Sequence, residues 1–385
     1  MRDLLLGREP KDFDIATDAL PEQVNETFRN CRLIGRRFRL AHVHFGREII
    51  EVATFRGNHE TAEQTSDEGM LLRDNVYGSI EEDAIRRDFT VNALFYNIDD
   101  FSVVDYVDGV NDLKAGVLKL IGDPETRYRE DPVRMLRAVR FAAKLGFNID
   151  PGCEKPIFEL GYLLDEVPPA RLFEEILKLL LSEFSVHAFE KLRHYDLFSH
   201  LFPATDACLQ IEEQHFPLQL VLKGLHNTEL RLREGKPVTP AFLFAVLLWE
   251  PVRQLYEKGL QRGAVAQAAM YDAADQVLAD QIRKISLPRR FSGPMKEIWI
   301  MQIRLERSTT PRKAERLMQS PRFRASYDFL LLRAESGEAD EKIAQWWTHI
   351  QEGTVLDPPP TVPASSKSKR RKRYRNRHSA RRKID

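Results

Sequence analysis

Two aspartates, Asp12 and Asp14, lie near the start of the chain on either side of Phe13. In a strand, residues at i and i+2 point to one side, so both carboxylates would face the same way and Phe13 would face a core on the other side. Carboxylates held in this way suit a pair of Mg²⁺ ions, which stabilise the attacking and the leaving oxygen of an in-line displacement. The alternative is a pair of solvated strand-end aspartates, which is the commoner case for a bare Asp-x-Asp. The pair suggests phosphoryl or nucleotidyl transfer. The surrounding sequence is needed to distinguish a metal-binding pair from two solvated aspartates.

The segments around this pair predict a small head of mixed α and β structure. A helix is expected to begin at Pro21, because proline suits the first helical position. Residues 38–45 and 48–55 are rich in Ile, Val, Phe and Thr and are separated by Gly46-Arg47, which is typical of an antiparallel hairpin. Short apolar runs between 88 and 120 predict a second β region that closes the head.

The rest of the chain predicts helices. From Asp131 onward apolar residues recur every three or four positions, and Gly146 is a suitable C-cap. Trp346 and Trp347 are expected to pack within a helix rather than to stack on bases. The fold class is therefore α+β, with a mixed-sheet head followed by an all-helical remainder. Further helices are expected at 170–183, 187–195, 214–226, 240–260, 264–284, 294–306, 311–320 and 323–350.

Composition limits the classes of protein. The chain has 385 residues, no run of roughly 18 or more apolar residues and no visible signal peptide, so no membrane span is expected. Its three scattered cysteines predict neither a disulfide framework nor a metal site, which suits a reducing cytoplasm. The net charge of zero hides an asymmetry, because residues 361–385 hold 11 Lys or Arg and one acid, which leaves residues 1–360 with a net charge of −10. A basic end on an acidic body predicts an electrostatic arm for nucleic acid.

Three blocks, in order, resemble the motifs of a known family. The run from Arg2 to Asp14 resembles the head motif of the class II template-independent nucleotidyltransferases, the group of the tRNA CCA-adding enzymes and the bacterial poly(A) polymerases. Residues 86–94, Arg-Arg-Asp-Phe-Thr-Val-Asn-Ala-Leu, are similar to the family's ribose-binding motif, and residues 130–141, Glu-Asp-Pro-Val-Arg-Met-Leu-Arg-Ala-Val-Arg-Phe, to its base-reading motif. The run 33–43 resembles the signature that separates the poly(A) polymerases from the CCA-adding enzymes. The resemblance covers nearly the whole chain.

This resemblance implies a polymerase-beta-like head and a polynucleotide adenylyltransferase, which adds AMP from ATP to RNA 3′ ends and so promotes RNA turnover. The implied cofactor is Mg²⁺, with Mn²⁺ as an alternative. The implied partners are ATP, RNA 3′ ends and the RNA-degradation machinery, and the protein is expected to be a monomer.

Two alternatives remain. One is a CCA-adding tRNA nucleotidyltransferase, which uses the same base-reading pair for CTP and ATP. The other is an inactive RNA-binding fragment, which follows from one departure. The family's head motif begins with a strand and a Gly-Gly pair, whereas Met1 stands here at the position of the motif's valine, so we expect an N-terminally truncated head.

The resemblance assigns catalytic roles to three carboxylates. Asp12 and Asp14 are expected to bind the metal ions. The third carboxylate is expected to be Glu81, which shortly precedes the 86–94 block. Glu51 on the second hairpin strand is the alternative, although pairing with a nearby arginine explains a strand glutamate at least as well.

The nucleotide-binding residues follow from the same blocks. Asp131 and Arg134 are at i and i+3, on one helical face. By resemblance Arg134 donates to ring acceptors of the base and Asp131 accepts from its exocyclic amine. Asp131 precedes Pro132, so it would also serve as a helix N-cap with proline at the first helical position. The remaining sugar, phosphate and triphosphate contacts are expected to be Arg2, Arg87, Asn92, Arg137 and Arg140.

RNA contacts are expected from two basic segments. Arg36 and Arg37 precede an alternating strand, which is consistent with an edge that faces phosphates. In the basic tail the expected contacts are Lys369, Arg370, Arg371, Lys372 and Arg373. The expected domains are a catalytic head at 1–125, a helical neck at 126–185, a helical body at 186–290, a helical arm at 291–355 and a disordered basic tail at 356–385.

Overall fold

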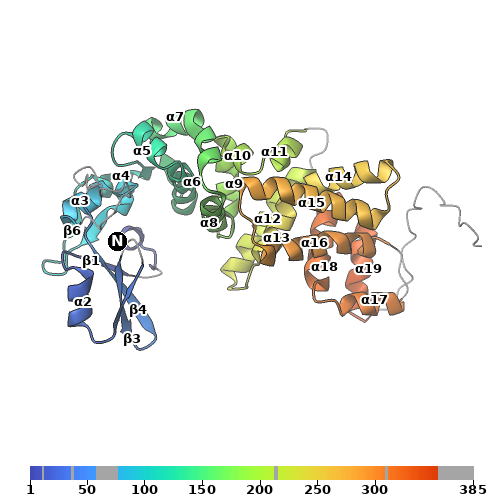
Figure 1. Cartoon of the computed structure of the whole chain (residues 1–385), viewed down its shortest axis with the longest axis horizontal. Helices are drawn as coiled ribbons and strands as arrows, with labels where there is room; N and C mark the ends of the chain where they lie inside the picture. The colour runs from blue at the N-terminus through green and yellow to red at the C-terminus, as the bar shows by residue number, and fades with distance from the viewer. Residues whose placement is uncertain (11–12, 36–38, 58–76, 212–215, 308–310, 354–385) are drawn as a thin grey trace, which may run out of the picture. The chain divides into compact units, whose positions relative to one another are not determined.

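The computed structural model describes residues 1–385 except 11–12, 36–38, 58–76, 212–215, 308–310 and 354–385. Asp12, Arg36, Arg37 and the basic tail with Lys369–Arg373 therefore lie outside the described residues. The chain forms two compact units, Met1–Ile300 and Met301–Asp385 (Figure 1). The boundary expected after residue 290 falls inside helix α16 (Arg289–Leu305), and the boundary between the two units lies in the same helix.

A four-stranded sheet begins the first unit. Strand β1 (Asp14–Thr17) lies at one edge and runs parallel to β4 (Glu48–Thr54), which is followed by the antiparallel strands β3 (Leu40–Phe45) and β2 (Cys31–Ile34). Strands β3 and β4 form the predicted hairpin, which turns at Gly46 with φ of +64°. Glycine adopts this left-handed conformation without the steric cost of a side chain.

Helix α2 (Pro21–Thr27) covers one face of this sheet and begins at Pro21, as predicted. Its Val24 is buried against Ala41, Val43 and Val52. Phe13 was expected to join such a core, but it is 67% exposed, so that expectation was wrong. The reason is the reach of α2, which has only seven residues and packs on β2, β3 and β4 rather than on the beginning of β1.

The second β region of the head is also present. Strands β5 (Leu94–Tyr96) and β6 (Val103–Asp105) are antiparallel, and they follow helix α3 (Ile80–Ile85) and a 3₁₀ turn at Thr90–Asn92. Helix α4 (Gly109–Ala115) leads to β7 (Val117–Leu118), which pairs with β8 (Asn148–Ile149). A short helix, α1 (Arg2–Leu5), precedes β1.

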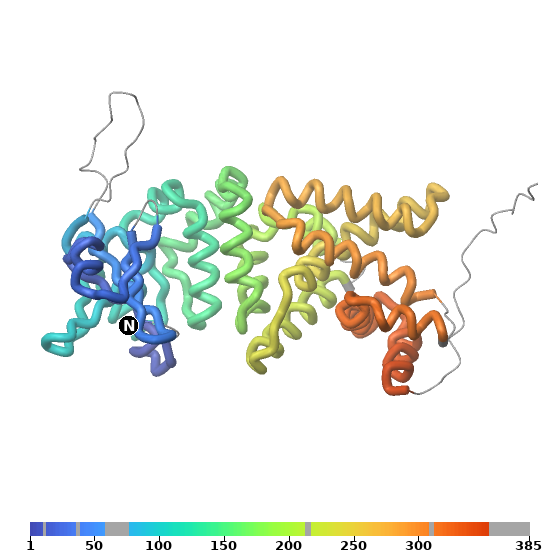
Figure 2. Tube along the Cα trace, turned by 60° about the horizontal axis from the view of Figure 1, so that its bottom comes forward, coloured from blue at the N-terminus to red at the C-terminus, as the bar shows by residue number. Residues whose placement is uncertain are grey.

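Helices make up the rest of the described chain (Figure 2). Helix α6 (Val133–Leu145) ends at Gly146 in the left-handed conformation, as predicted. Its buried face packs on α8 (Pro169–Leu180) and α9 (Ser185–His194). The other helices of this unit are α5 (Pro124–Glu130), α7 (Pro151–Leu160), α10 (Leu197–Leu201), α11 (Pro203–Leu209), α12 (Phe216–Arg233), α13 (Pro240–Leu247), α14 (Trp249–Gln261) and α15 (Ala266–Lys284).

The second unit packs around two tryptophans. Trp347 is fully buried, donates from its indole nitrogen to the Leu305 carbonyl at 2.9 Å and contacts Trp346, so the expected packing role is confirmed. The unit contains the end of α16 with α17 (Pro311–Met318), α18 (Phe323–Glu335) and α19 (Glu341–Gln351). No helix in the described part of the whole chain combines the length and the apolar character that crossing a bilayer requires.

Candidate active site

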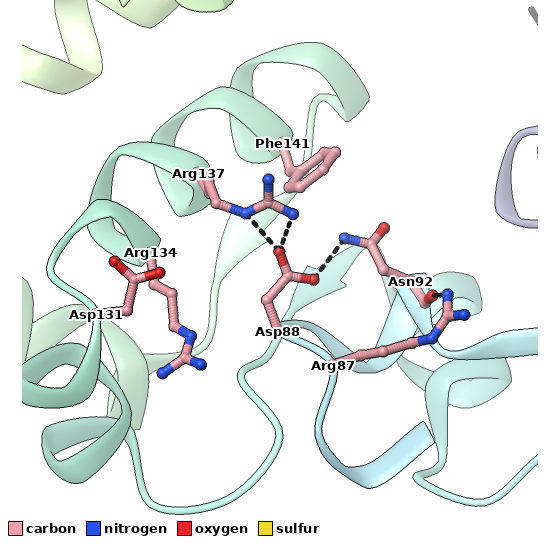
Figure 3. Close-up of a pocket in the computed structure, with 7 residues that line it drawn as sticks. All are labelled: Arg87, Asp88, Asn92, Asp131, Arg134, Arg137 and Phe141. Carbon is pink, nitrogen blue, oxygen red and sulfur yellow. Dashed lines mark hydrogen bonds and ion pairs between the residues drawn. The ribbon is translucent and has the colours of Figure 1, made fainter. Parts of the chain in front are cut away.

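A cavity of about 420 Å³ lies where the loop after α3 meets the start of α6 (Figure 3). Its lining joins two blocks that are about forty residues apart in the sequence. Five of the seven lining residues are predicted nucleotide contacts, namely Arg87, Asn92, Asp131, Arg134 and Arg137, and the other two are Asp88 and Phe141. The fold therefore brings the expected ribose-binding and base-reading residues into one pocket.

Asp88 joins the two sides of this pocket. One carboxylate oxygen accepts from Nε of Arg137 at 2.7 Å and from its Nη2, and the other accepts from the Asn92 amide at 3.1 Å and the Phe89 backbone N–H at 2.9 Å. Two donors of one guanidinium that meet the same carboxylate oxygen hold the arginine in place and restrict its orientation. Asp88 was not among the predicted site residues, although an acid that directly follows two arginines in the 86–94 block was a usable signal.

Arg87 forms an ion pair with a buried acid, Asp83 on α3. The Arg87 guanidinium donates to Asp83 Oδ2 at 2.9 and 3.1 Å and to the Asn92 carbonyl at 3.1 Å, while Arg86 donates to Oδ1 of the same carboxylate. Burial by itself would raise the pKa of Asp83, but Arg87 and Arg86 outweigh burial and keep the pKa below its ordinary value. Asp83 therefore stays ionised and keeps Arg87 against the pocket.

Arg2 reaches the same group of residues from the start of the chain. It donates to the side-chain oxygen of Asn92, and its guanidinium lies 5.0 Å from the centre of the Phe141 ring. The neighbouring Asp3 accepts from Lys144 on α6 at 3.1 Å and from Arg2, and these two cations lower the pKa of Asp3 to about 2 despite its partial burial. Helix α1 is thereby tied to α6, which places Arg2 beside the cavity.

Three guanidinium groups lie close to the aromatic ring of Phe141. Arg140, Arg2 and Arg137 lie 4.3, 5.0 and 5.5 Å from the ring centre. Cations at such distances are attracted to the ring face. Arg140 is not among the residues that line the cavity, and its Nε lies 3.3 Å from a carboxylate oxygen of Glu175 on α8. Burial lowers the pKa of Arg140, and the Glu175 carboxylate opposes this effect.

Asp131 and Arg134 form one wall of the cavity, across from Arg87 and Asn92 in Figure 3. Asp131 accepts from the Val133 backbone N–H at 3.2 Å and from Arg171 on α8 at 2.6 Å. Asp131 thus supports the start of α6, although Pro132 is the residue at the cap position, one place later than expected. Arg134 donates from Nη1 to the Arg127 carbonyl at 2.7 Å and to Glu130 at 2.8 Å.

Of the two expected metal ligands, the structure places Asp14 on the sheet. Asp14 opens β1 and is exposed, while Asp12 is outside the described residues. The strand register places Asp14 directly opposite Glu51 on the parallel strand β4. Partner residues on neighbouring strands are roughly 4.8 Å apart and point to the same face. Carboxylate oxygens gathered in this way suit Mg²⁺, which prefers hard oxygen ligands.

Glu81, the preferred third carboxylate, occupies a different place. It lies in the first turn of α3, where it is exposed, and not on the sheet that carries Asp14. Among the described residues, no three His, Cys, Asp or Glu side chains converge closely enough to hold a metal ion. The strand register therefore favours Glu51, the alternative, as the residue that stands beside Asp14.

Models of protein families match three parts of the chain. The "Poly A polymerase head domain" matches residues 1–119, the "Probable RNA and SrmB- binding site of polymerase A" matches 146–209, and the "Polymerase A arginine-rich C-terminus" matches 262–383. Poly(A) polymerase I of Salmonella typhimurium is 50% identical over 360 residues, which cover 91% of this chain and 77% of that protein. The protein of the same name from Haemophilus influenzae is 49% identical, with 91% and 79% covered. The chain belongs to the poly(A) polymerase family.

More distant relatives of this chain are CCA-adding enzymes. The CCA-adding enzyme of Lactobacillus helveticus is 37% identical over 190 residues, only 49% of this chain and 46% of that protein. A crystal structure of a tRNA nucleotidyltransferase complexed with a primer tRNA and an incoming ATP analogue has a TM-score of 0.61 at 24% identity, with 91% of this chain and 93% of that chain covered. This likeness confirms the expected fold, an α+β chain with a polymerase-beta-like head.

Proposed function

We propose that this protein adds AMP from ATP to RNA 3′ ends without a nucleic-acid template. The observation that supports this most is the cavity itself, which collects the base-reading and phosphate-binding residues of the poly(A) polymerase family in one place. The amino group of Met1 interacts electrostatically with both Asp14 on the sheet and Arg87 in the cavity lining.

The cavity is suited to a nucleoside triphosphate. Its lining holds three arginines against two aspartates, and Arg2 adds a further positive charge at Asn92. Arginine's planar fork matches phosphate oxygens and sugar hydroxyls. Because Asp83 and Asp88 already orient Arg87 and Arg137, little conformational freedom has to be lost when the anion binds.

Asp131 and Arg134 are proposed to read the base. Both side chains already have protein partners, but a carboxylate has about four acceptor positions and a guanidinium has five donors, so each retains hydrogen-bonding capacity toward the cavity. Asp131 can accept from the exocyclic amine of adenine while Arg134 donates to the adjacent ring nitrogen. The protein side chains then take the place of a template.

Asp12, Asp14 and Glu51 are proposed to hold Mg²⁺, with Glu51 in place of Glu81. Metal ions bound there would lower the pKa of the attacking 3′-hydroxyl and stabilise charge on the transferred phosphoryl group. The protein's part is to hold Asp14 and Glu51 side by side on one face of the sheet, while the arginines of the cavity orient the triphosphate toward them. The bond from the RNA 3′-oxygen to the α-phosphorus forms as the bond to pyrophosphate breaks.

The activity test uses a generic RNA primer, Mg²⁺ and one nucleotide at a time. We expect long tails from ATP and hardly any incorporation from CTP, and the control is the Asp14→Asn variant, which should extend the primer far more slowly. Addition that requires CTP and stops after three nucleotides would instead favour CCA repair.

The RNA is proposed to contact the helical segment 146–209 and the basic tail. Deletion of residues 361–385 removes 11 basic groups. The slope of log K against log[salt] for single-stranded RNA should then become shallower by about 0.7 for each phosphate that the tail neutralises. Equal slopes for the full-length and the truncated protein would show that the tail does not touch RNA.

A further inference from the structure

One row of side chains crosses all four strands of the sheet. The register pairs Asp14 of β1 with Glu51 of β4, Glu51 with His42 of β3, and His42 with Arg32 of β2. Partners in register point to the same face of a sheet. His42 therefore shares the face that carries Asp14 and Glu51, opposite to the face covered by α2.

His42 contacts Glu51 directly. Its Nε2 lies 3.3 Å from Oε1 of the glutamate. The two side chains differ in freedom, because that of His42 is 17% exposed and that of Glu51 is 49% exposed. On β3 the neighbours of His42, Ala41 and Val43, are buried in the core under α2, which fixes the backbone from which the imidazole projects. The histidine is therefore the more fixed partner.

We propose that His42 is a positioning residue for the metal-binding carboxylate Glu51. In this role the imidazole, with its proton on Nε2, would donate to Oε1, which it contacts at 3.3 Å, and would leave the other carboxylate oxygen for the metal ion. No charge on the ring is needed. The inference rests on the proposed function, since Glu51 must first act as a ligand, and it gives a chemical role to one residue of the 33–43 run.

The same strand offers a matched control. His44 lies two residues further along β3, so its side chain points to the same face as that of His42. Its register partner on β4 is the apolar Ile49 instead of an acid. A substitution at His44 thus removes an imidazole from the same strand and face while leaving the pairing of His42 with Glu51 in place.

The test compares His42→Leu, His42→Gln and His42→Asn with His44→Leu. Glutamine can place its amide nitrogen where the imidazole Nε2 stands, whereas asparagine is shorter and cannot. The first measurement is Mn²⁺ binding to the full-length protein by electron paramagnetic resonance, in the presence of a non-hydrolysable ATP analogue. The second is the dependence of kcat on Mg²⁺ concentration, with KM for ATP determined at saturating Mg²⁺.

We expect His42→Leu and His42→Asn to weaken Mn²⁺ binding by about 10- to 100-fold, the usual cost of losing a hydrogen-bonded partner of a metal ligand. His42→Gln should recover most of the affinity, and His44→Leu should match the unmodified protein. KM for ATP should stay unchanged, because the cavity residues are untouched.

Native Mn²⁺ affinity in His42→Leu would overturn the inference. Equal losses in the Gln and Asn variants would also overturn it, because they would indicate a packing role. The proposed function fails separately, if the unmodified protein does not add AMP or if Glu51→Gln leaves metal binding intact.

Discussion

In the cavity between the 86–94 and 130–141 blocks the charged side chains are already paired with one another, whereas on the sheet face the carboxylates have few partners. Asp88 binds Arg137 and Asn92, and Asp83 binds Arg87. The side chain of Asp14, by contrast, has no hydrogen-bond or ion-pair partner within the described part of the chain, and that of Glu51 has only His42 there. One region is organised by its own ion pairs, and the other presents carboxylates that have few side-chain partners among the described residues.

This difference shows what each region requires from its ligand. A cavity with oriented arginines can accept a large anion without rearrangement, because the arginine side chains already lost their conformational entropy when the protein folded. Carboxylates side by side on neighbouring strands repel one another, and an opposite charge between them relieves that repulsion. Substitutions on the sheet should therefore affect chemistry with little loss of stability, whereas substitutions in the cavity should affect nucleotide affinity and local order.

The largest effect is expected for Asp14→Asn. This change keeps the shape of an exposed side chain but removes a proposed metal ligand, so kcat should fall on the order of 10³-fold or more. The melting temperature should not fall, because a repulsive charge is removed. Measured kcat and thermal unfolding check both points. A variant with near-native turnover would remove Asp14 from the mechanism and would abolish the contrast between the two regions.

The second-largest effect on kcat tests whether Glu51 or Glu81 is the third carboxylate. Glu51→Gln should lower kcat by roughly 10²-fold, equivalent to about 3 kcal/mol, because the charge beside Asp14 is removed. Glu81→Gln should stay within about twofold of native, since that side chain is exposed on α3. Steady-state assays at saturating Mg²⁺ decide between them. The reverse order of effects would restore Glu81 as the third carboxylate.

The sequence motifs located the cavity well but not the partners within it. Arg87, Asn92 and Arg134 were predicted because they stand in blocks with a recognisable order. Asp88 and Phe141 stand in the same blocks, yet their roles depend on which arginines approach them from other helices, and spacing along one chain does not show that. Glu51 was ranked below Glu81 because strand register, which puts it next to Asp14, is a relation between distant segments.

For the fold as well, features set by single residues were predicted, whereas features that depend on contacts between distant segments were not. The helix start at Pro21 and the cap at Gly146 were predicted because they depend on single residues with fixed conformational preferences. The helix expected over 240–260 is two helices that meet at Leu248, and the one expected over 323–350 is interrupted near Gly337. Phe13 was placed in a core because alternation identifies a face of a strand but not how far a helix covers it.

A smaller effect, on affinity and selectivity, is expected for Arg134→Ala. Loss of a charged donor to the base should raise KM for ATP about 10-fold or more, since hydrogen bonds to charged groups contribute roughly 1.5–3 kcal/mol. The preference for ATP over CTP should fall, while the Mg²⁺ dependence should stay native because the sheet is untouched. Ratios of kcat/KM for the two nucleotides measure this. An unchanged ratio would limit Asp131 and Arg134 to supporting the start of α6.

The smallest effect compares two arginines of α6 that both stack on Phe141. Arg137 lines the cavity and forms a two-pronged pair with Asp88, whereas Arg140 is paired with Glu175 outside it. Lysine keeps the charge but cannot reproduce a two-pronged bond. Arg137→Lys should therefore raise KM for ATP by up to about 10-fold, which steady-state assays over a range of ATP concentrations measure.

Arg140→Lys should change KM by less than about twofold, because a lysine can still neutralise Glu175, and any cost should appear in thermal stability instead. The two substituted residues are three positions apart on the same helix, so a general loss of structure in α6 would affect both variants. If Arg140→Lys raised KM for ATP as much as Arg137→Lys, the phosphate-binding surface would extend past Phe141 to α8. The ion pair with Glu175 would then have to open when ATP binds, and the cavity would be less fixed in advance than its other ion pairs indicate.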